Sequence, residues 1–455
     1  MNKRMIKKEE HMRNQRRRRP VRRHRRSTIE AFLPVIMACL LITIIAVPVV
    51  WSMSKKKSKN NEDNNQNSEQ QEKPTIVSDE IEKIMKEAER MAAMYDYDRA
   101  VKKIDEAIAL DPENEEVLGK KVKYTRNKTK LVPYTGEVAH VFFHSLIVNP
   151  KLCFDGYPDP SQVDGYNKWM TTLEEFKKMM SQMRTNGYVL VRFEDFCEEV
   201  KGENGKVTYK QKAIMLPEGK KPFVLSQDDV NYYEYMEHDG FASKFVFDED
   251  GNVKNLYIDE NGKEHIGDYD MVPALDTFLD EHPDFSYKGA KGYIGETGYE
   301  GSLGYDTHKP DSKTFKEDQE MVKALAKALR EDGWEFASHS YGHGHMNSQS
   351  LEKVKQDANS WEKEVGSLIG PVDVYLYPYG EGAPADSDKF KYLQAKGFKY
   401  FCGVGAKTFN LFKDGYVFMD RSNLDGYAMH NRSELLSKFF NSKKVWDKSR
   451  PKFNQ

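Results

Sequence analysis

Three apolar runs in the second half of the chain each end in side chains that can take part in chemistry. KPFVL leads into SQDD, which ends in Asp228 and Asp229, and WEFAS leads into HSYGHGH, which contains His339 and His343. VDVYL leads into YPYG, where a rigid proline turn can aim the backbone N–H of Tyr379 into a site. Adjacent carboxylates repel each other unless a cation lies nearby. One Asp and two His that leave open positions are a common ligand set for catalytic zinc.

Each run also has an ordinary structural interpretation. The two aspartates can form a solvated turn or a helix cap, and the histidines of a Gly-rich loop can be merely exposed or form an adventitious metal patch. The proline turn is by default a structural feature. Their conjunction favours a catalytic metal site, because all three runs follow strands of one alternating domain, where they can meet.

Strand-like runs alternate with amphipathic helices from about residue 134 to the C-terminus. This alternation predicts an α/β domain of parallel strands with crossover helices. About seven units fit either a closed barrel or an open wound sheet, and the chain order alone does not decide between them. Barrel enzymes place their chemistry at the carboxyl ends of the strands, which is where the three runs end. Residues 245–270 interrupt the alternation with DEDGN and DENGK, which predict turns of a small surface lobe.

These motifs resemble those of the polysaccharide deacetylases (carbohydrate esterase family 4). SQDD is similar to the family's TFDD, HSYGH matches its H-[ST]-x-x-H, and YPYG resembles its third motif. Residues 140–195, with a strand that carries His144, are similar to the family's entry region. The resemblance covers roughly residues 134–450 and implies a distorted (β/α)7 barrel.

The resemblance also implies a role for each motif residue. Asp228 becomes the general base, and the metal ligands become Asp229, His339 and His343, with Zn2+ as the expected ion. The backbone N–H of Tyr379 helps to hold the oxyanion. The implied reaction is the hydrolysis of an N-acetyl group to acetate and a free amine.

Two positions depart from the family pattern. Leu376 stands where many members carry an arginine that orients the base, and Arg421 in MDRSN is the candidate to supply that charge. The family's L-x-x-H acid motif is not evident, so His430 in YAMH is the first candidate for the general acid. His345 is a candidate third ligand or a supporting group.

The N-terminal region predicts a membrane anchor. Residues 1–28 form a basic tail, and residues 29–53 contain an uncharged apolar stretch long enough to span a bilayer. The excess of Arg and Lys before this stretch predicts a cytoplasmic N-terminus and a single-pass protein whose catalytic domain lies outside the cell membrane. A cleaved signal peptide is disfavoured because VVWSMSKKK lacks small residues at a cleavage site. The basic run is explained by topology, so no nucleic-acid partner is expected.

Between the anchor and the barrel we expect two further segments. Residues 54–75 are rich in Asn, Gln, Ser and charge, which predicts a disordered linker. Residues 76–130 have helical periodicity, including a helix from about Tyr97 to Leu110, and resemble a single tetratricopeptide repeat. One such unit is expected to be a spacer, although a protein partner for it is possible. The catalytic domain is then assigned to residues 131–455.

The leading hypothesis is a membrane-anchored, metal-dependent hydrolase that removes N-acetyl groups from an extracellular glycan of the peptidoglycan or poly-N-acetylglucosamine type. A first alternative is a deacetylase-like module that binds glycan without turnover, since the motif arginine is missing and the acid is unassigned. A second alternative is a scaffold in which the helical spacer recruits a partner. Acetate release, and its loss in Asp228→Asn, separates the enzyme from the binding module.

Overall fold

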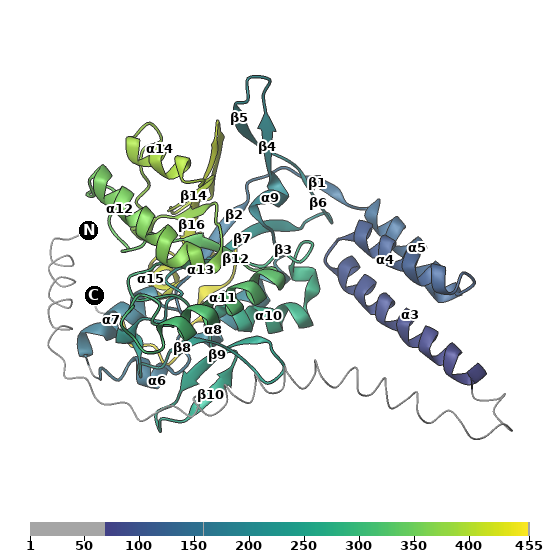
Figure 1. The fold of residues 1–455 in the computed structure, drawn as a ribbon, viewed down its shortest axis with the longest axis horizontal. Helices are drawn as coiled ribbons and strands as arrows, with labels where there is room; N and C mark the ends of the chain where they lie inside the picture. Colours follow the sequence, from purple (N-terminus) through teal and green to yellow (C-terminus); the bar gives the residue numbers. More distant parts are fainter. Residues whose placement is uncertain (1–68, 158, 454–455) are drawn as a thin grey trace. The chain divides into compact units, whose positions relative to one another are not determined.

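Seven parallel strands close into a barrel within the part of the chain that the computed structural model describes, residues 69–157 and 159–453 (Figure 1). Around the barrel their order is β7, β11, β12, β13, β14, β16 and β2, and β2 pairs with β7 to close the ring. The predicted (β/α)7 barrel is thus confirmed. The strands span Ala139–Phe143 (β2), Lys221–Gln227 (β7), Tyr293–Glu296 (β11), Glu335–Ser338 (β12), Val374–Leu376 (β13), Tyr400–Val404 (β14) and Tyr416–Asn423 (β16).

The barrel is distorted where β7 meets two neighbours on one edge. β3 (Tyr188–Leu190) pairs with the first half of β7, and β11 pairs with its second half at Ser226 and Gln227. β15 (Phe409–Lys413) is an additional antiparallel partner of β16 and pairs with it ahead of the residues that pair with β2. Every residue of β2 and of β13 is buried. Such burial on both faces explains why these strands read as continuous apolar runs.

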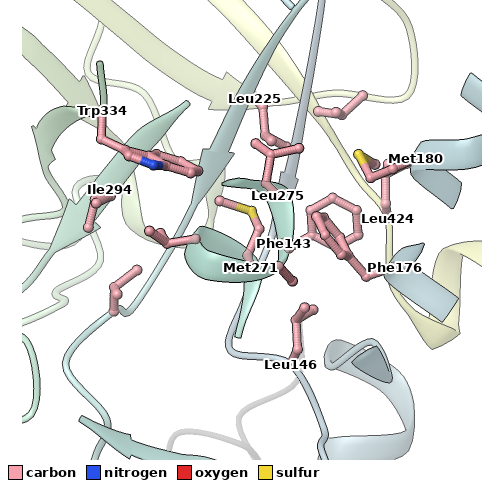
Figure 2. Packing of buried hydrophobic residues seen from close by; sticks show 14 of the residues in the cluster. Phe143, Leu146, Phe176, Met180, Leu225, Met271, Leu275, Ile294, Trp334 and Leu424 are labelled. Carbon is pink, nitrogen blue, oxygen red and sulfur yellow. The ribbon is translucent and has the colours of Figure 1, made fainter. Parts of the chain in front are cut away.

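Helices cover the outside of the barrel and bury one apolar face against it. Phe176 and Met180 of one helix lie close to Phe143 and Leu225 of the strands (Figure 2). Thr172 and Glu175 form a capping box at the start of that helix. The main covering helices are α8 (Leu173–Thr185), α10 (Met271–Glu281), α11 (Phe315–Glu331), α12 (Leu351–Trp361) and α14 (Asp388–Ala395).

The lobe predicted at 245–270 is a three-stranded antiparallel sheet. Its strands are β8 (Ala242–Phe247), β9 (Val253–Ile258) and β10 (Glu264–Gly267), joined by turns at the two predicted sites. Two further pairings were not predicted, β4 (Cys197–Lys201) with β5 (Val207–Gln211), and β1 (Val132–Tyr134) with β6 (Ile214–Leu216).

Three helices precede the barrel. They are α3 (Glu69–Ala93), α4 (Tyr97–Leu110) and α5 (Glu115–Lys128), so α4 has the predicted bounds, while α3 begins ahead of the predicted spacer. α3 therefore includes residues 69–75 of the predicted linker. These residues are rich in Glu, Gln and Lys, which are good helix formers. At the end of α3, the Tyr95 hydroxyl donates to the Asp284 carbonyl at 2.7 Å. The tetratricopeptide resemblance stays a prediction.

Residues 77–455 form one compact unit, which contains the helices α4 and α5 and the barrel. The predicted basic tail, membrane anchor and most of the linker lie outside the described residues. Among the residues that are described, no helix has both the length and the apolar character needed to cross a membrane.

The last described residues are tied to the barrel by a buried ion pair. Arg450 donates to both carboxylate oxygens of Glu175, at 2.7 and 2.6 Å, and both side chains are fully buried. The same guanidinium donates to the backbone carbonyls of Asn167 and Met170, at 2.9 and 2.7 Å. One side chain thus fixes the C-terminal segment, the start of α8 and the loop before it.

Replacing Arg450 by Met should lower the free energy of unfolding by about 3–5 kcal/mol, because it leaves the Glu175 carboxylate buried without its partner. Urea unfolding of the full chain measures the loss. The matched control is Arg90→Met, which removes a pair with Asp280 between half-exposed and exposed side chains and should cost less than about 1 kcal/mol. Equal losses in the two variants would contradict the assigned role of Arg450.

Candidate active site

The residues singled out by their chemistry lie at one end of the barrel. Asp228 and Asp229 directly follow β7, His339 directly follows β12, and Tyr379 lies in the turn after β13. His144 directly follows β2. Since the carboxyl ends of parallel strands in a closed barrel share one face, these side chains surround a common space.

Two of these residues, together with His343 from the loop after β12, form a group that could hold a metal ion. One ligand atom each from Asp229, His339 and His343 lies within 4.8 Å of the others. The His343 Nε2 atom is 3.9 Å from Asp229 Oδ2. The structure thus brings together the three predicted ligands, although they come from the ends of two different strands and from a loop.

Hydrogen bonds orient the members of this group. The Nδ1 atom of His339 is 2.8 Å from the Leu376 carbonyl, and since a carbonyl only accepts, Nδ1 carries the proton. The lone pair of His339 is then on Nε2, which lies 3.7 Å from Asp228 Oδ2. The Tyr233 hydroxyl donates to Asp229 Oδ1 at 2.6 Å. Such outer contacts fix the tautomer and the direction of metal ligands.

The protonation of the group also fits a cation. Burial lowers the pKa of His343 to about 4, against the opposing charge of Asp229. Burial alone would raise the pKa of Asp229, but the charges of three histidines and the Tyr233 hydrogen bond together hold this pKa below its usual value. Near pH 7 the site therefore offers neutral imidazole and ionised carboxylate, the forms in which these side chains bind metals.

Asp228 is paired with the buried Arg421. The Nη1 atom of Arg421 donates to Asp228 Oδ1 at 2.5 Å, and both side chains are at most 3% exposed. Burial alone would raise the pKa of Asp228, but the Arg421 charge, the His339 charge and the Arg421 hydrogen bond hold this pKa well below its usual range. A guanidinium from β16 thus stands beside the aspartate, although Leu376 occupies the expected arginine position on β13.

Several residues of the site have strained backbone conformations. Asp229, His343 and Tyr379 have φ angles of 61°, 48° and 59°, in the left-handed region that residues other than glycine rarely adopt. Ser340, between the two histidines, has a φ of 61°. Each such residue costs of order 1–3 kcal/mol, and such strain clusters at functional sites.

Tyr379 lies over the two loop histidines. Its ring centroid is 4.6 Å from that of His343 and 3.8 Å from that of His345, and the second pair is stacked at 10°. His345 Nδ1 is 3.0 Å from Glu381 Oε1. His345 therefore supports the Tyr379 turn, and its ring is paired with Glu381 instead of completing the metal group.

His430 lies on the exposed side of α15 (Gly426–Asn431). Its ring stacks on Phe453 with centroids 4.4 Å apart, and its Nδ1 is 3.3 Å from the Asn431 side chain. None of its contacts among the described residues is with Asp228 or Asp229. His430 thus lies on the side of α15 that faces the C-terminal segment.

His144 is the site residue to which the sequence assigned no role. The register of β2 and β7 pairs Phe143 with Gln227, so His144 and Asp228 follow neighbouring strand ends, and the charge of His144 lowers the pKa of both Asp228 and Asp229. Its Nδ1 atom is 3.1 Å from the Trp169 carbonyl. The available signal was its position directly after a buried strand, the same position that marks Asp228 and His339.

Comparisons with known proteins agree with the motifs. Residues 305–401 match the family model described as polysaccharide deacetylase, a range that contains His339, His343 and Tyr379. A search of curated proteins finds no match.

Two solved structures are distantly similar. The deacetylase PplD of Streptococcus pyogenes, in complex with acetate, is 13% identical, with a TM-score of 0.34 over 65% of this chain and 94% of that one. A putative polysaccharide deacetylase from Mycobacterium smegmatis is 17% identical, with a TM-score of 0.24 over 35% and 46%. At these TM-scores the two structures add nothing to the family match. That match confirms the resemblance that the motifs predicted: residues 305–401 of this chain are similar to the polysaccharide deacetylases.

Proposed function

We propose that this chain is a metal-dependent N-deacetylase that acts on an extracellular N-acetylated glycan. The observation that carries the proposal is the convergence of Asp229, His339 and His343 beside the ionised Asp228. Two imidazoles and one carboxylate that leave positions open are typical of catalytic zinc sites, so we propose Zn2+ as the ion. When bound, such an ion polarises a carbonyl and lowers the pKa of a water molecule.

The residues around the group supply the remaining parts of an amide hydrolysis. Asp228, kept ionised by Arg421, accepts a proton from the water that attacks the acetyl carbon. The backbone N–H of Tyr379 donates to the oxygen on which negative charge develops. His144 donates a proton to the nitrogen as the C–N bond breaks. The products are acetate and a free amine on the sugar.

The alternative of a glycan-binding module without turnover was motivated by the missing motif arginine and the unassigned acid. Arg421 forms an ion pair with Asp228, and His144 follows the carboxyl end of β2, on the same side of the barrel as the carboxylates. Arg421 is thus a candidate for the missing arginine and His144 for the unassigned acid, and both support an enzyme that turns over its substrate.

We further propose that the apolar stretch in residues 29–53 anchors the protein in the cell membrane with the catalytic domain outside. This proposal rests on the uncharged length of the stretch and on the basic residues before it. An exported domain fits a substrate in the cell wall, such as peptidoglycan or poly-N-acetylglucosamine.

Acetate release from N-acetylglucosamine oligomers by the full chain in detergent, with added zinc, tests the activity. Asp228→Asn should keep bound zinc but lose roughly 10²–10⁴-fold in rate, because the general base is removed and the ligands remain. Asp229→Asn should lose both zinc and activity. Asp250→Asn, in an exposed turn, is the matched control and should lose neither. Full activity in Asp228→Asn would refute the assigned base.

Replacing Arg421 by Met should move the acid limb of the kcat/KM profile to higher pH by about one to three units. The folded pKa of Asp228 lies below its usual range because of Arg421. Without that charge Asp228 takes up its proton at a higher pH, so activity is lost earlier as the pH falls. In Arg421→Lys, which keeps a positive charge, the acid limb should move to higher pH by less than in Arg421→Met. An unmoved acid limb in Arg421→Met would contradict this role.

His144→Gln should reduce kcat by roughly 10²–10⁴-fold, because the amine leaves without its proton donor. His430→Gln is the matched comparison, since His430 contacts the C-terminal segment, and it should change kcat less than about twofold on this account. The opposite ranking of the two variants would restore His430 as the acid.

A further inference from the structure

An exposed pair of aromatic rings lies beside His144. Trp169 at the end of α7 (Pro160–Trp169) is 40% exposed, whereas the other tryptophans of the described residues are buried or half-buried. The half-buried ring of Tyr427 on α15 lies next to it, with centroids 5.4 Å apart and planes at 33°. The two neighbouring rings together offer an apolar aromatic surface next to His144.

Hydrogen bonds hold this pair in place next to the catalytic residues. His144 donates its Nδ1 proton to the Trp169 carbonyl at 3.1 Å, so the same residue contacts both the pair and the site. Two residues on, the Thr171 hydroxyl donates to the Leu424 carbonyl at 2.5 Å and joins the loop after α7 to the loop after β16. α7 and α15 lie side by side (Figure 1).

The start of α15 is also close to the site. Asp425 caps this helix by accepting from the Ala428 N–H at 2.7 Å, and the charge of His144 acts on the Asp425 carboxyl. The Leu424 N–H, just before Asp425, donates to the Phe142 carbonyl at 3.1 Å, which brings the start of α15 against the end of β2 that precedes His144. The aromatic pair is therefore adjacent to the proposed catalytic residues, with His144 between them.

We propose that Trp169 and Tyr427 form a platform for a sugar ring adjacent to the one whose acetamide is hydrolysed. This rests on the proposed function and makes its substrate a chain of at least two gluco-configured rings. A pyranose with all substituents equatorial presents axial C–H groups on its faces, and these apolar faces fit flat aromatic rings. The polar edges of such a sugar stay in water beside an exposed platform, which agrees with the 40% exposure of Trp169.

Kinetics on N-acetylglucosamine and on its trimer test the platform. In Trp169→Ala the ratio of kcat/KM for the trimer to that for the single sugar should fall roughly tenfold, as expected for the loss of one aromatic stacking contact of about 1.4 kcal/mol. Trp169→Phe should recover most of the ratio, and Tyr427→Ala should lower it. Tyr392→Ala, which removes a partly exposed ring from α14, should leave it unchanged. An unchanged ratio in Trp169→Ala overturns the platform.

A binding measurement separates the platform from the activity. The Asp228→Asn protein should bind the trimer with quenching of tryptophan fluorescence, and adding Trp169→Ala should abolish the quenching and weaken binding roughly tenfold. If the unsubstituted protein releases no acetate from any oligomer, the proposed function fails while this measurement still tests the platform. Equal trimer binding with and without Trp169 overturns the platform even if acetate is released.

Discussion

The structure at the end of the barrel depends on how two adjacent carboxylates are held together. Asp228 and Asp229 follow the same buried strand, and both their mutual repulsion and their loss of water oppose ionisation. Arg421 offsets this cost for Asp228, and the two histidines offset it in part for Asp229. A divalent ion among Asp229, His339 and His343 would complete the compensation, which is why this site is suited to a cation.

That compensation requires a closed barrel. β2 lies between β16 and β7, and its His140 is aligned with Arg421 on one side and with Val224 on the other. Closure thereby brings a guanidinium from the end of the chain against an aspartate almost two hundred residues earlier. On the opposite edge of β7, β11 and β12 bring His339 to the same carboxylates. If the ring were open between β7 and β11, β12 and its His339 would lie near the opposite edge of the sheet from β7 and its carboxylates.

Sequence reasoning succeeded where the signal was local. The apolar runs that end in Asp229 and His339 indicated strand ends, and the turns of the 245–270 lobe were marked by Gly and Asn. The alternation of strands and helices alone did not predict closure, because it fits an open sheet equally well, and the barrel was expected only from the resemblance of the motifs to a family. His144 carried no local signal apart from its position after a strand. The direction of His430 depends on the phase of a six-residue helix, which the sequence does not specify.

The central claim is that Asp229, His339 and His343 bind one divalent ion with Asp228 beside it. Anomalous diffraction at the zinc absorption edge, from crystals of the full chain grown with zinc, tests this directly. The account predicts a single strong peak about 2.0–2.2 Å from one oxygen of Asp229 and one nitrogen of each histidine, with Asp228 outside the ligand set. No peak among these three residues, or a peak ligated by His345 and Glu381 instead, would contradict it.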